Sequence, residues 1–126
     1  DTILKKALKN EELGIVSDQF GSPTNASDLA EALLMIIQND VFRNTELDNQ
    51  IYHYSNGGSC SWFEFAKLII EIKGVDCRIK KILTKDFPTT AKRPLMTLMN
   101  KDKIVDTFGI QIFDWKESLK KCVTLI

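Results

Sequence analysis

The sequence has few of the residues on which metal sites, nucleophile systems and cross-links depend. Its 126 residues include one histidine, three cysteines and three prolines. A lone His53 has no second ligand at metal-binding spacing, so we expect a structural or half-buried strand residue. Cys60, Cys77 and Cys122 cannot all pair within one chain, and none forms a Cys-x-x-Cys spacing. We therefore expect reduced structural thiols and no metal site.

Long apolar runs are also lacking. No stretch approaches the roughly 18–20 residues of a membrane span, and the first residues do not have the layout of a signal peptide. The length and the 44% hydrophobic content suit a single domain, which we expect to be cytoplasmic. Residues 1–63 carry four basic and nine acidic side chains, and residues 64–126 carry 13 and eight. This asymmetry allows a local anion site, but bulk nucleic-acid binding is not expected.

The usual machinery of nicotinamide-dependent reduction is missing from the sequence. Gly57-Gly58 is an isolated pair and does not form the glycine-rich turn that brings a backbone close to a pyrophosphate. No Tyr-x-x-x-Lys pair is present, because Tyr52 is followed four residues later by Asn56 and Tyr54 by Gly58. We therefore expect no catalytic and no cofactor-binding residue in this chain.

Helical and strand patterns alternate along the sequence, which predicts an α/β fold with short strands and about four to five helices. A helix is already under way over residues 2–9, so the chain reads as a part of something longer, and a short strand follows over residues 14–17. The other expected elements are helices over residues 27–38, 61–73, 100–108 and 115–123, and short strands over residues 51–55 and 78–83. Residues 39–49 and 87–94 are expected to be irregular connections.

Several residues mark the expected helix ends. Ser27 is a candidate N-cap for the helix over residues 27–38, whose wide apolar arc predicts that it is largely buried. Ser61 and Glu64 have the spacing of a capping box, and Gly74 is expected to end the helix that they open.

Two segments are candidates for ligand binding. The loop after the strand over residues 14–17 lies where open α/β sheets bind ligands, although an ordinary strand-to-helix connection would have similar composition. Its candidate contact residues are Gln19, Phe20, Gly21, Pro23 and Thr24. The second segment, residues 78–93, has six basic residues and one acidic residue. There Arg93 is fixed beside a proline and can present its planar fork to a phosphate; the alternative is a solvated basic surface.

Two tryptophans at expected helix starts leave two interpretations open. Trp62 and Trp115 could stack on a base or a sugar, but such residues more often anchor a core.

Taken together, these motifs resemble the dTDP-4-dehydrorhamnose reductase family, and the similarity spans nearly the whole chain. The residues that carry it are VSDQFGSPT at 16–24, DLA at 28–30, YHYSNGG at 52–58, SWFEFA at 61–66, AKRP at 91–94, NKDK at 100–103, FGI at 108–110 and DW at 114–115. The first run is fairly specific to that reductase, whereas the Arg-Pro and Phe-Gly elements occur more widely among nucleotide-sugar reductases and epimerases.

The resemblance implies that residues 1–126 form the small C-terminal substrate-binding domain of an extended short-chain reductase. The family's N-terminal Rossmann domain, which is not present in this sequence, holds NADPH and the Tyr/Lys pair. By this analogy the full protein reduces dTDP-4-dehydro-L-rhamnose to dTDP-L-rhamnose for polysaccharide synthesis, and the fragment alone is inactive. The implied partners are the dTDP-sugar and the protein's own Rossmann domain, with oligomerisation through the exposed domain interface.

The same resemblance assigns candidate roles to individual residues. It places Gln19, Phe20, Gly21, Pro23 and Thr24 along the substrate cleft and turns Arg93 toward the diphosphate. Some family members bind magnesium between subunits through carboxylates near the C-terminus. This chain has no acidic residue after Glu117, so we do not expect a metal-linked dimer. Two alternatives remain: the same domain of another nucleotide-sugar reductase or epimerase, and a stand-alone ligand-binding or interaction module.

Overall fold

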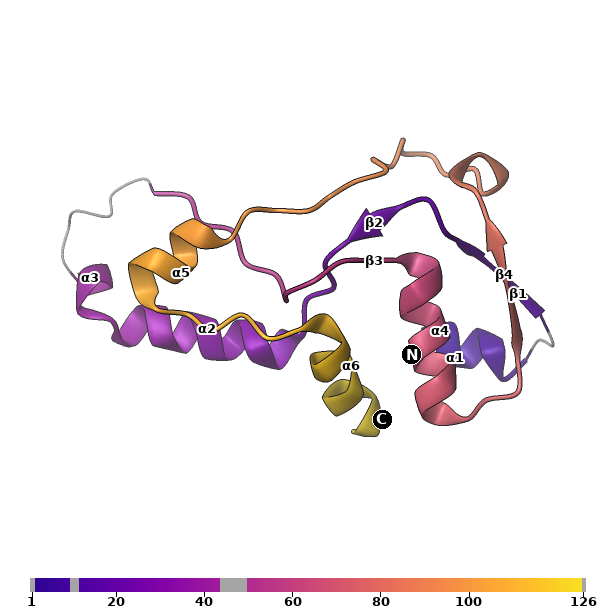
Figure 1. Cartoon of the computed structure of the whole chain (residues 1–126), viewed down its shortest axis with the longest axis horizontal. Helices are drawn as coiled ribbons and strands as arrows, with labels where there is room; N and C mark the ends of the chain where they lie inside the picture. The colour runs from indigo at the N-terminus through magenta and orange to yellow at the C-terminus, as the bar shows by residue number, and fades with distance from the viewer. Residues whose placement is uncertain (1, 10–11, 44–49, 126) are drawn as a thin grey trace.

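Helices and short strands alternate along the chain in the computed structural model, which describes residues 2–9, 12–43 and 50–125 (Figure 1). The helices in these residues are α1 (Thr2–Ala7), α2 (Ala26–Gln38), α3 (Asp40–Arg43), α4 (Trp62–Lys73), α5 (Asp102–Phe108) and α6 (Trp115–Thr124). The strands are β1 (Glu12–Val16), β2 (Phe20–Gly21), β3 (Cys60–Ser61) and β4 (Arg78–Ile82), and a 3-10 turn, η2 (Thr84–Asp86), follows β4. The predicted α/β class is confirmed.

Strand pairing brings together segments that are far apart in the sequence. β1 and β4 form a parallel pair that ends with Val16 opposite Ile82. β2 pairs antiparallel with β3, where Phe20 lies opposite Ser61. Phe20 also forms a parallel bridge with Met96 on its other side. Three distant parts of the chain therefore meet at β2.

Two apolar clusters hold the helices. The first, between α4 and α6, comprises Cys60, Ile69, Trp115, Leu119 and Val123, against which Ile3 and Leu4 of α1 pack. The second, between α2 and α5, comprises Ala32, Ile104, Phe108 and Ile110. Figure 1 shows α2 and α5 at one end of the elongated molecule, α1, α4 and the β1–β4 pair at the other, and α6 between them.

A buried polar network, made by Asp28, Asn56 and Ser118, joins these two ends. Asn56 is fully buried and donates through Nδ2 to Asp28 Oδ2 at 2.5 Å and to Ser118 Oγ at 3.0 Å. The Ser118 hydroxyl donates to the same Asp28 oxygen. Asn56 Oδ1 accepts the backbone N–H of Asn25 at 2.7 Å. Because Asp28 lies on α2 and Ser118 on α6, the network fixes both helices to the segment around Asn56.

The predicted helix ends are confirmed in part. The prediction of Ser27 as the N-cap of α2 is wrong: Asn25 is the cap, and its Oδ1 accepts from the backbone N–H groups of Ser27 and Asp28. Both residue types cap well, but the chain enters the helix two residues earlier than its apolar pattern indicates. The Ser61 capping box is present, and Gly74 ends α4 in the left-handed conformation, with φ of 61°.

The prediction that α2 is largely buried is wrong. Leu33, Leu34 and Ile37 are 50%, 57% and 55% exposed. The second apolar cluster covers one side of the helix, through Ala32 and Ile36, and no described element packs against the remaining apolar arc. None of the helices in the described residues is both long and apolar enough to cross a membrane.

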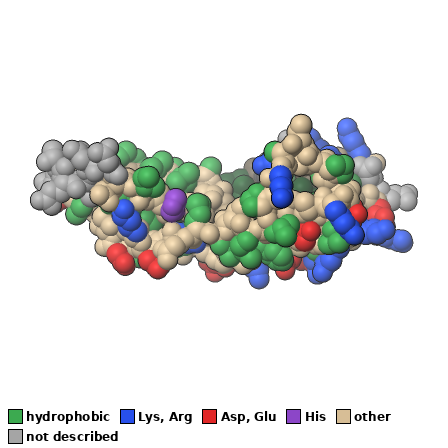
Figure 2. Space-filling model, turned by 90° about the horizontal axis from the view of Figure 1, so that it is seen from above, with side chains coloured by type: hydrophobic (Ala, Val, Ile, Leu, Met, Phe, Trp, Pro, Cys, Tyr) green, Lys and Arg blue, Asp and Glu red, His purple; other side chains and the backbone are tan. Residues whose placement is uncertain are grey.

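The strand predicted over residues 51–55 is also wrong, since this segment forms no ladder. Tyr52 and Tyr54 instead pack against the second apolar cluster, and the rings of Tyr52 and Phe108 lie 5.0 Å apart. The alternating pattern therefore reflects side-chain packing on the second apolar cluster and not strand pairing. His53, between the two tyrosines, is exposed and lies outside any strand, and Figure 2 shows the single histidine at the surface.

Replacing Ser118 by alanine should reveal how much the buried polar network stabilises the fold. Ser118→Ala leaves the buried Asp28 carboxylate without one of its donors, so we expect the free energy of unfolding to fall by about 1.5–3 kcal/mol. Ser59→Ala makes the same chemical change at an exposed position and should alter the free energy of unfolding by less than about 0.5 kcal/mol. Urea denaturation of both variants gives the two values, and equal losses would contradict the role of the network.

Candidate functional site

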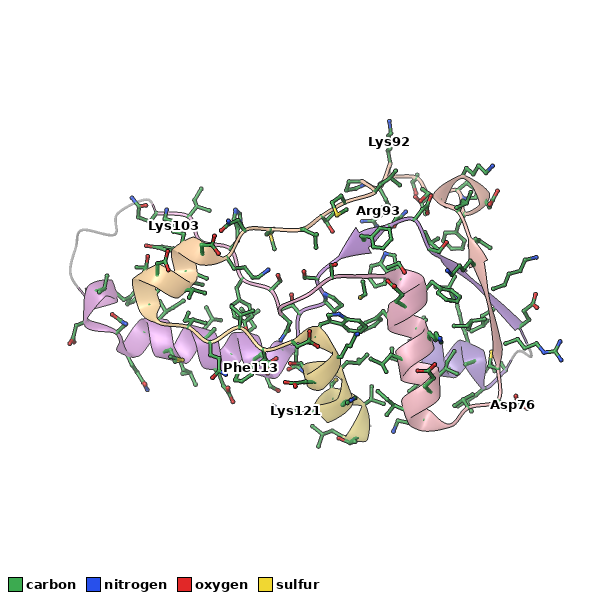
Figure 3. The ribbon with its side chains drawn as sticks, viewed as in Figure 1. Asp76, Lys92, Arg93, Lys103, Phe113 and Lys121 are labelled. Carbon is green, nitrogen blue, oxygen red and sulfur yellow. The ribbon has the colours of Figure 1, made fainter. Side chains whose placement is uncertain are left out.

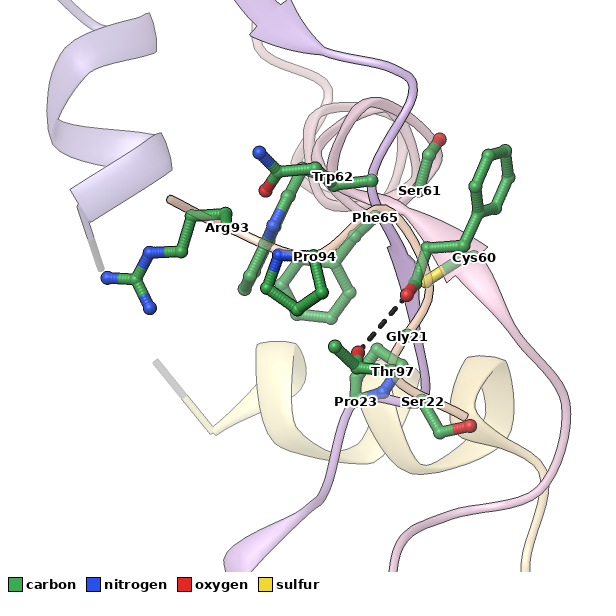
Figure 4. Close-up of a pocket in the computed structure, with 12 residues that line it drawn as sticks. Gly21, Ser22, Pro23, Cys60, Ser61, Trp62, Phe65, Arg93, Pro94 and Thr97 are labelled. Atoms are coloured by element: carbon green, nitrogen blue, oxygen red, sulfur yellow. Dashed lines mark hydrogen bonds between the residues drawn. The ribbon is translucent and has the colours of Figure 1, made fainter. Parts of the chain in front are cut away.

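The main pocket of the described structure is a cavity of about 360 Å³ between three chain segments (Figure 4). One wall is the loop over residues 19–23, and the second comes from Cys60, Ser61, Trp62 and Phe65 at the start of α4. Arg93, Pro94 and Thr97 form the third. The site is therefore built by residues up to 78 positions apart in the sequence.

Backbone pairing at β2 holds the first and third walls together. The Phe20 N–H donates to the Leu95 carbonyl at 2.8 Å, and the Thr97 N–H donates to the Phe20 carbonyl at 3.0 Å. The Thr97 hydroxyl donates to the same carbonyl at 3.1 Å, as the dashed line in Figure 4 shows. A Cβ on Gly21 would lie 2.7 Å from Thr97 Oγ1. A larger residue at this position would therefore displace the Thr97 hydroxyl from its bond to the Phe20 carbonyl.

The loop over residues 19–23 is fixed at its beginning by Asp18 and Gln19. The Asp18 carboxylate accepts the Thr84 N–H at 2.9 Å and the Thr84 hydroxyl at 2.7 Å. Gln19 Nε2 donates to Thr84 Oγ1 at 3.1 Å. The two bonds from Thr84 to the Asp18 carboxylate, the one from the hydroxyl first, lower the pKa of Asp18 from its ordinary value of 3.8. The end of β1 is thereby attached to the turn that follows β4.

The same loop is connected to the buried polar network through Gly58. The Ser22 hydroxyl donates to the Gly58 carbonyl at 2.7 Å. Gly58 has φ of +76°, and a Cβ there would lie 3.0 Å from the Trp115 ring. The neighbouring Gly57 N–H donates to the Phe113 carbonyl at 2.7 Å, and Asn56 Nδ2 donates to the same carbonyl at 3.2 Å. The position of the loop therefore depends on the packing around Asn56.

The capping box places a negative charge at the start of α4. Glu64 accepts the Ser61 N–H at 2.7 Å, and this bond is the main cause that lowers the pKa of Glu64 from its ordinary value of 4.5. The adjacent Cys60 is 5% exposed, and burial raises the pKa of its thiol to about 11. Cys60 is therefore a neutral wall residue at physiological pH.

Five of the six residues singled out from the sequence meet at the main pocket: Gln19, Phe20, Gly21, Pro23 and Arg93. The sixth, Thr24, lines a second cavity of about 90 Å³, which shares Pro23 and Phe65 with the main pocket. Arg93 is exposed and forms no ion pair within the described ranges. Its guanidinium extends away from Pro94 in Figure 4, and Figure 3 shows Lys92 leaving the chain in a different direction.

Sequence reasoning missed several lining residues. Cys60, Phe65 and Thr97 lacked any local signal, because their part in the pocket depends on long-range pairing at β2. The two tryptophans differ: Trp115 is 4% exposed and belongs to the core, as expected, whereas Trp62 is 57% exposed and lines the pocket. The core interpretation of Trp62 is therefore wrong.

The described residues do not form a binding site for a dinucleotide. The segment after β1, residues 17–21, has one glycine and runs into β2, so it offers no glycine-rich turn at a helix start. Within the described ranges, no group of three His, Cys, Asp or Glu side chains could hold a metal ion. What these residues do provide is an apolar pocket with one cation at its edge.

Fold and pocket together define a small α/β domain whose apolar pocket has one cationic side chain, Arg93, at its edge. All 126 residues match the family described as "RmlD substrate binding domain". The chain belongs to this family.

Named relatives agree with this membership. A dTDP-4-dehydrorhamnose reductase from Sinorhizobium fredii is 34% identical over 96% of this chain and 42% of its own length. The spore coat polysaccharide biosynthesis protein SpsK of Bacillus subtilis is 36% identical over 96% of the chain and 40% of its length. The chain thus spans about two fifths of the curated relatives that it matches.

Solved structures share the fold. A dTDP-4-dehydrorhamnose reductase from Clostridium acetobutylicum aligns with a TM-score of 0.87 and 33% identity, over 98% of this chain and 42% of that one. The enzyme from Bacillus anthracis, solved in complex with NADP, aligns with a TM-score of 0.86 and 30% identity, over 99% and 42%.

The attachment of the pocket loop should be visible in the titration of Asp18. Thr84→Val removes the hydroxyl donor but keeps the backbone donor, so we expect the pKa of Asp18 to rise part of the way toward 3.8. A lowered folded-state pKa stabilises the fold above the ordinary value, and this stabilisation is lost as the pH falls through the lowered pKa. Carboxyl ¹³C NMR measures the shift. Thr84→Ser keeps the hydroxyl and should retain the low pKa, and an unchanged pKa in Thr84→Val would contradict this attachment.

Proposed function

We propose that this chain is the substrate-binding portion of a dTDP-4-dehydrorhamnose reductase. The full protein would reduce the 4-keto group of dTDP-4-dehydro-L-rhamnose, with NADPH, to give dTDP-L-rhamnose for polysaccharide precursors. The observation that carries the proposal is the meeting of the loop over residues 19–23 with Arg93 at one pocket in a chain of this family. The polysaccharide-related name of the Bacillus subtilis relative supports the same pathway class.

In this proposal Arg93 binds the diphosphate. The ring of Pro94 fixes its own φ angle and restricts the backbone of the preceding residue, Arg93. The Arg93 guanidinium forms no ion pair with a carboxylate of the described residues. A planar guanidinium forms charge-assisted pairs with phosphate oxygens. Gln19, Phe20, Gly21 and Pro23 would contact the remainder of the substrate. Thr24 would border the same cleft from the second cavity.

The proposed role of this chain is positioning and not proton or hydride transfer. NADPH would supply the hydride from the remaining, N-terminal Rossmann portion of the protein, because the residues described here offer no site for it. Holding two reactants in register lowers a barrier by roughly 7–11 kcal/mol at the upper limit, so a domain without catalytic residues is still essential. The exposed arc of α2, with Leu33, Leu34 and Ile37, is a candidate contact with that portion or with a second protomer.

Arg93→Ala in the full-length protein should raise the KM for the dTDP-sugar about 10- to 100-fold, as expected on losing a charge-assisted contact to a phosphate. The affinity for NADPH should stay nearly unchanged. Lys92→Ala removes the neighbouring positive charge, which does not line the pocket, and is the matched control. Steady-state kinetics with both substrates separates the effects. Equal losses for both ligands, or an equal effect of Lys92→Ala, would contradict the role of Arg93.

The isolated 126-residue chain should show no turnover with NADPH and dTDP-4-dehydrorhamnose, whereas the full-length protein should oxidise NADPH under the same conditions. The physical reason is the lack of a cofactor site and of a Tyr/Lys pair in these residues. Loss of NADPH absorbance at 340 nm is the assay. Measurable turnover by the purified chain would refute the proposed division of roles.

A further inference from the structure

The orientation of the Gln19 amide in the main pocket is set from outside the pocket. Gln19 Nε2 donates to Thr84 Oγ1 at 3.1 Å, and Thr84 does not itself line the cavity. The Thr84 hydroxyl donates in turn to the Asp18 carboxylate at 2.7 Å. Asp18, Thr84 and Gln19 therefore form a series of hydrogen bonds that ends at a pocket side chain.

The direction of this series follows from the chemistry of its first member. An ionised carboxylate can only accept hydrogen bonds, and a hydroxyl has a single proton to donate. Because the proton of Thr84 is committed to Asp18, the Thr84 oxygen can only accept from Gln19. The amide is thus held with its nitrogen, and not its oxygen, toward Thr84.

The Asp18 carboxylate is itself held in place. It also accepts the backbone N–H of Thr84 at 2.9 Å, and the bonds from Thr84 lower the pKa of Asp18, so the group is ionised at neutral pH. Without such a partner, a glutamine amide has no fixed direction, because its oxygen and nitrogen ends are nearly equal in size.

The carbonyl oxygen of Gln19 is left for a ligand. Gln19 lines the main pocket, and no described residue donates a hydrogen bond to its Oε1. With Nε2 turned to Thr84, the carbonyl is the polar atom on the other side of the planar amide. Gln19 therefore presents an acceptor to the cavity.

Two hydroxyls of the same pocket have the same polarity. The Ser22 hydroxyl donates to the Gly58 carbonyl at 2.7 Å, and the Thr97 hydroxyl donates to the Phe20 carbonyl at 3.1 Å. A carbonyl oxygen cannot donate in return, so each hydroxyl keeps only acceptor lone pairs for a ligand. A ligand group that also only accepts would leave these oxygens unpaired, which is costly in a pocket closed to water.

We propose that Thr84 is a positioning residue, which turns the Gln19 carbonyl into the main pocket to accept a hydrogen bond from a donor group of the ligand. In a nucleotide-sugar this donor is a hydroxyl group. The inference rests on the proposed function, and it adds the polarity of the contact at Gln19 and the residue outside the pocket that sets it.

The test is a double-variant cycle in the full-length protein, with the affinity for dTDP-L-rhamnose measured by isothermal titration calorimetry. Thr84→Val removes the oxygen that holds the amide, so we expect binding to weaken about 3- to 10-fold. Thr84→Ser keeps the hydroxyl and should stay within about twofold of the native protein. Gln19→Met has a similar length without the amide and should weaken binding about as much as Thr84→Val. Adding Thr84→Val to Gln19→Met should cause no further loss, because Thr84 acts through Gln19.

Two further probes define the contact. Inorganic pyrophosphate offers anionic oxygens to Arg93 and no hydroxyl group, so its binding should not respond to these variants. dTDP lacks the sugar, so a loss confined to dTDP-L-rhamnose places the donor on the sugar. An equal loss for dTDP places the donor on the nucleoside.

Four results would overturn the inference. Native affinity for dTDP-L-rhamnose in Thr84→Val would show that the amide needs no positioning. An equal loss in Thr84→Ser would show that the hydroxyl is not the group that matters. Additive losses in the double variant would mean that Thr84 does not act through Gln19, and weakened pyrophosphate binding would mean that the whole pocket is disturbed. A native protein that binds neither dTDP nor dTDP-L-rhamnose would contradict the proposed function itself, so the two failures are distinguishable.

Discussion

The architecture depends on the buried hydrogen bonds among Asp28, Asn56 and Ser118. A fully buried asparagine beside a buried carboxylate is costly unless every polar atom finds a partner, and here the partners come from α2, from α6 and from the backbone of Asn25 and Phe113. Few arrangements of the chain satisfy all of them. The network therefore selects one relative position for the two apolar clusters and, through the adjacent glycine pair, for the loop that lines the main pocket.

Features decided within a few residues could be predicted from the sequence. The capping box at Ser61 and the glycine stop at Gly74 follow from local rules, and the structure shows both. The strand predicted over residues 78–83 is present as β4, Arg78–Ile82. The pocket loop was also recognisable, because its amide, aromatic, glycine and proline follow the end of a strand. Its likeness to a known family added which distant segment, the one with Arg93, belongs beside it.

Features decided by distant contacts could not be predicted. The alternating tyrosines around His53 resemble a strand, yet they pack against the apolar cluster between α2 and α5 and not against a neighbouring strand. The apolar arc of α2 indicates a buried helix, but the described residues cover only one side of it. Trp62 and Trp115 occupy equivalent positions at helix starts, and only the packing of α4 against α6 makes one a core residue and the other a pocket wall.

The most direct test of the account is a crystal structure of the full-length protein with dTDP-L-rhamnose. We expect density for the nucleotide in the pocket formed by the residue 19–23 loop, the start of α4 and the residue 93–97 segment. The diphosphate should lie within hydrogen-bond distance of the Arg93 guanidinium. Density for the nucleotide elsewhere, with this pocket filled only by water, would contradict it.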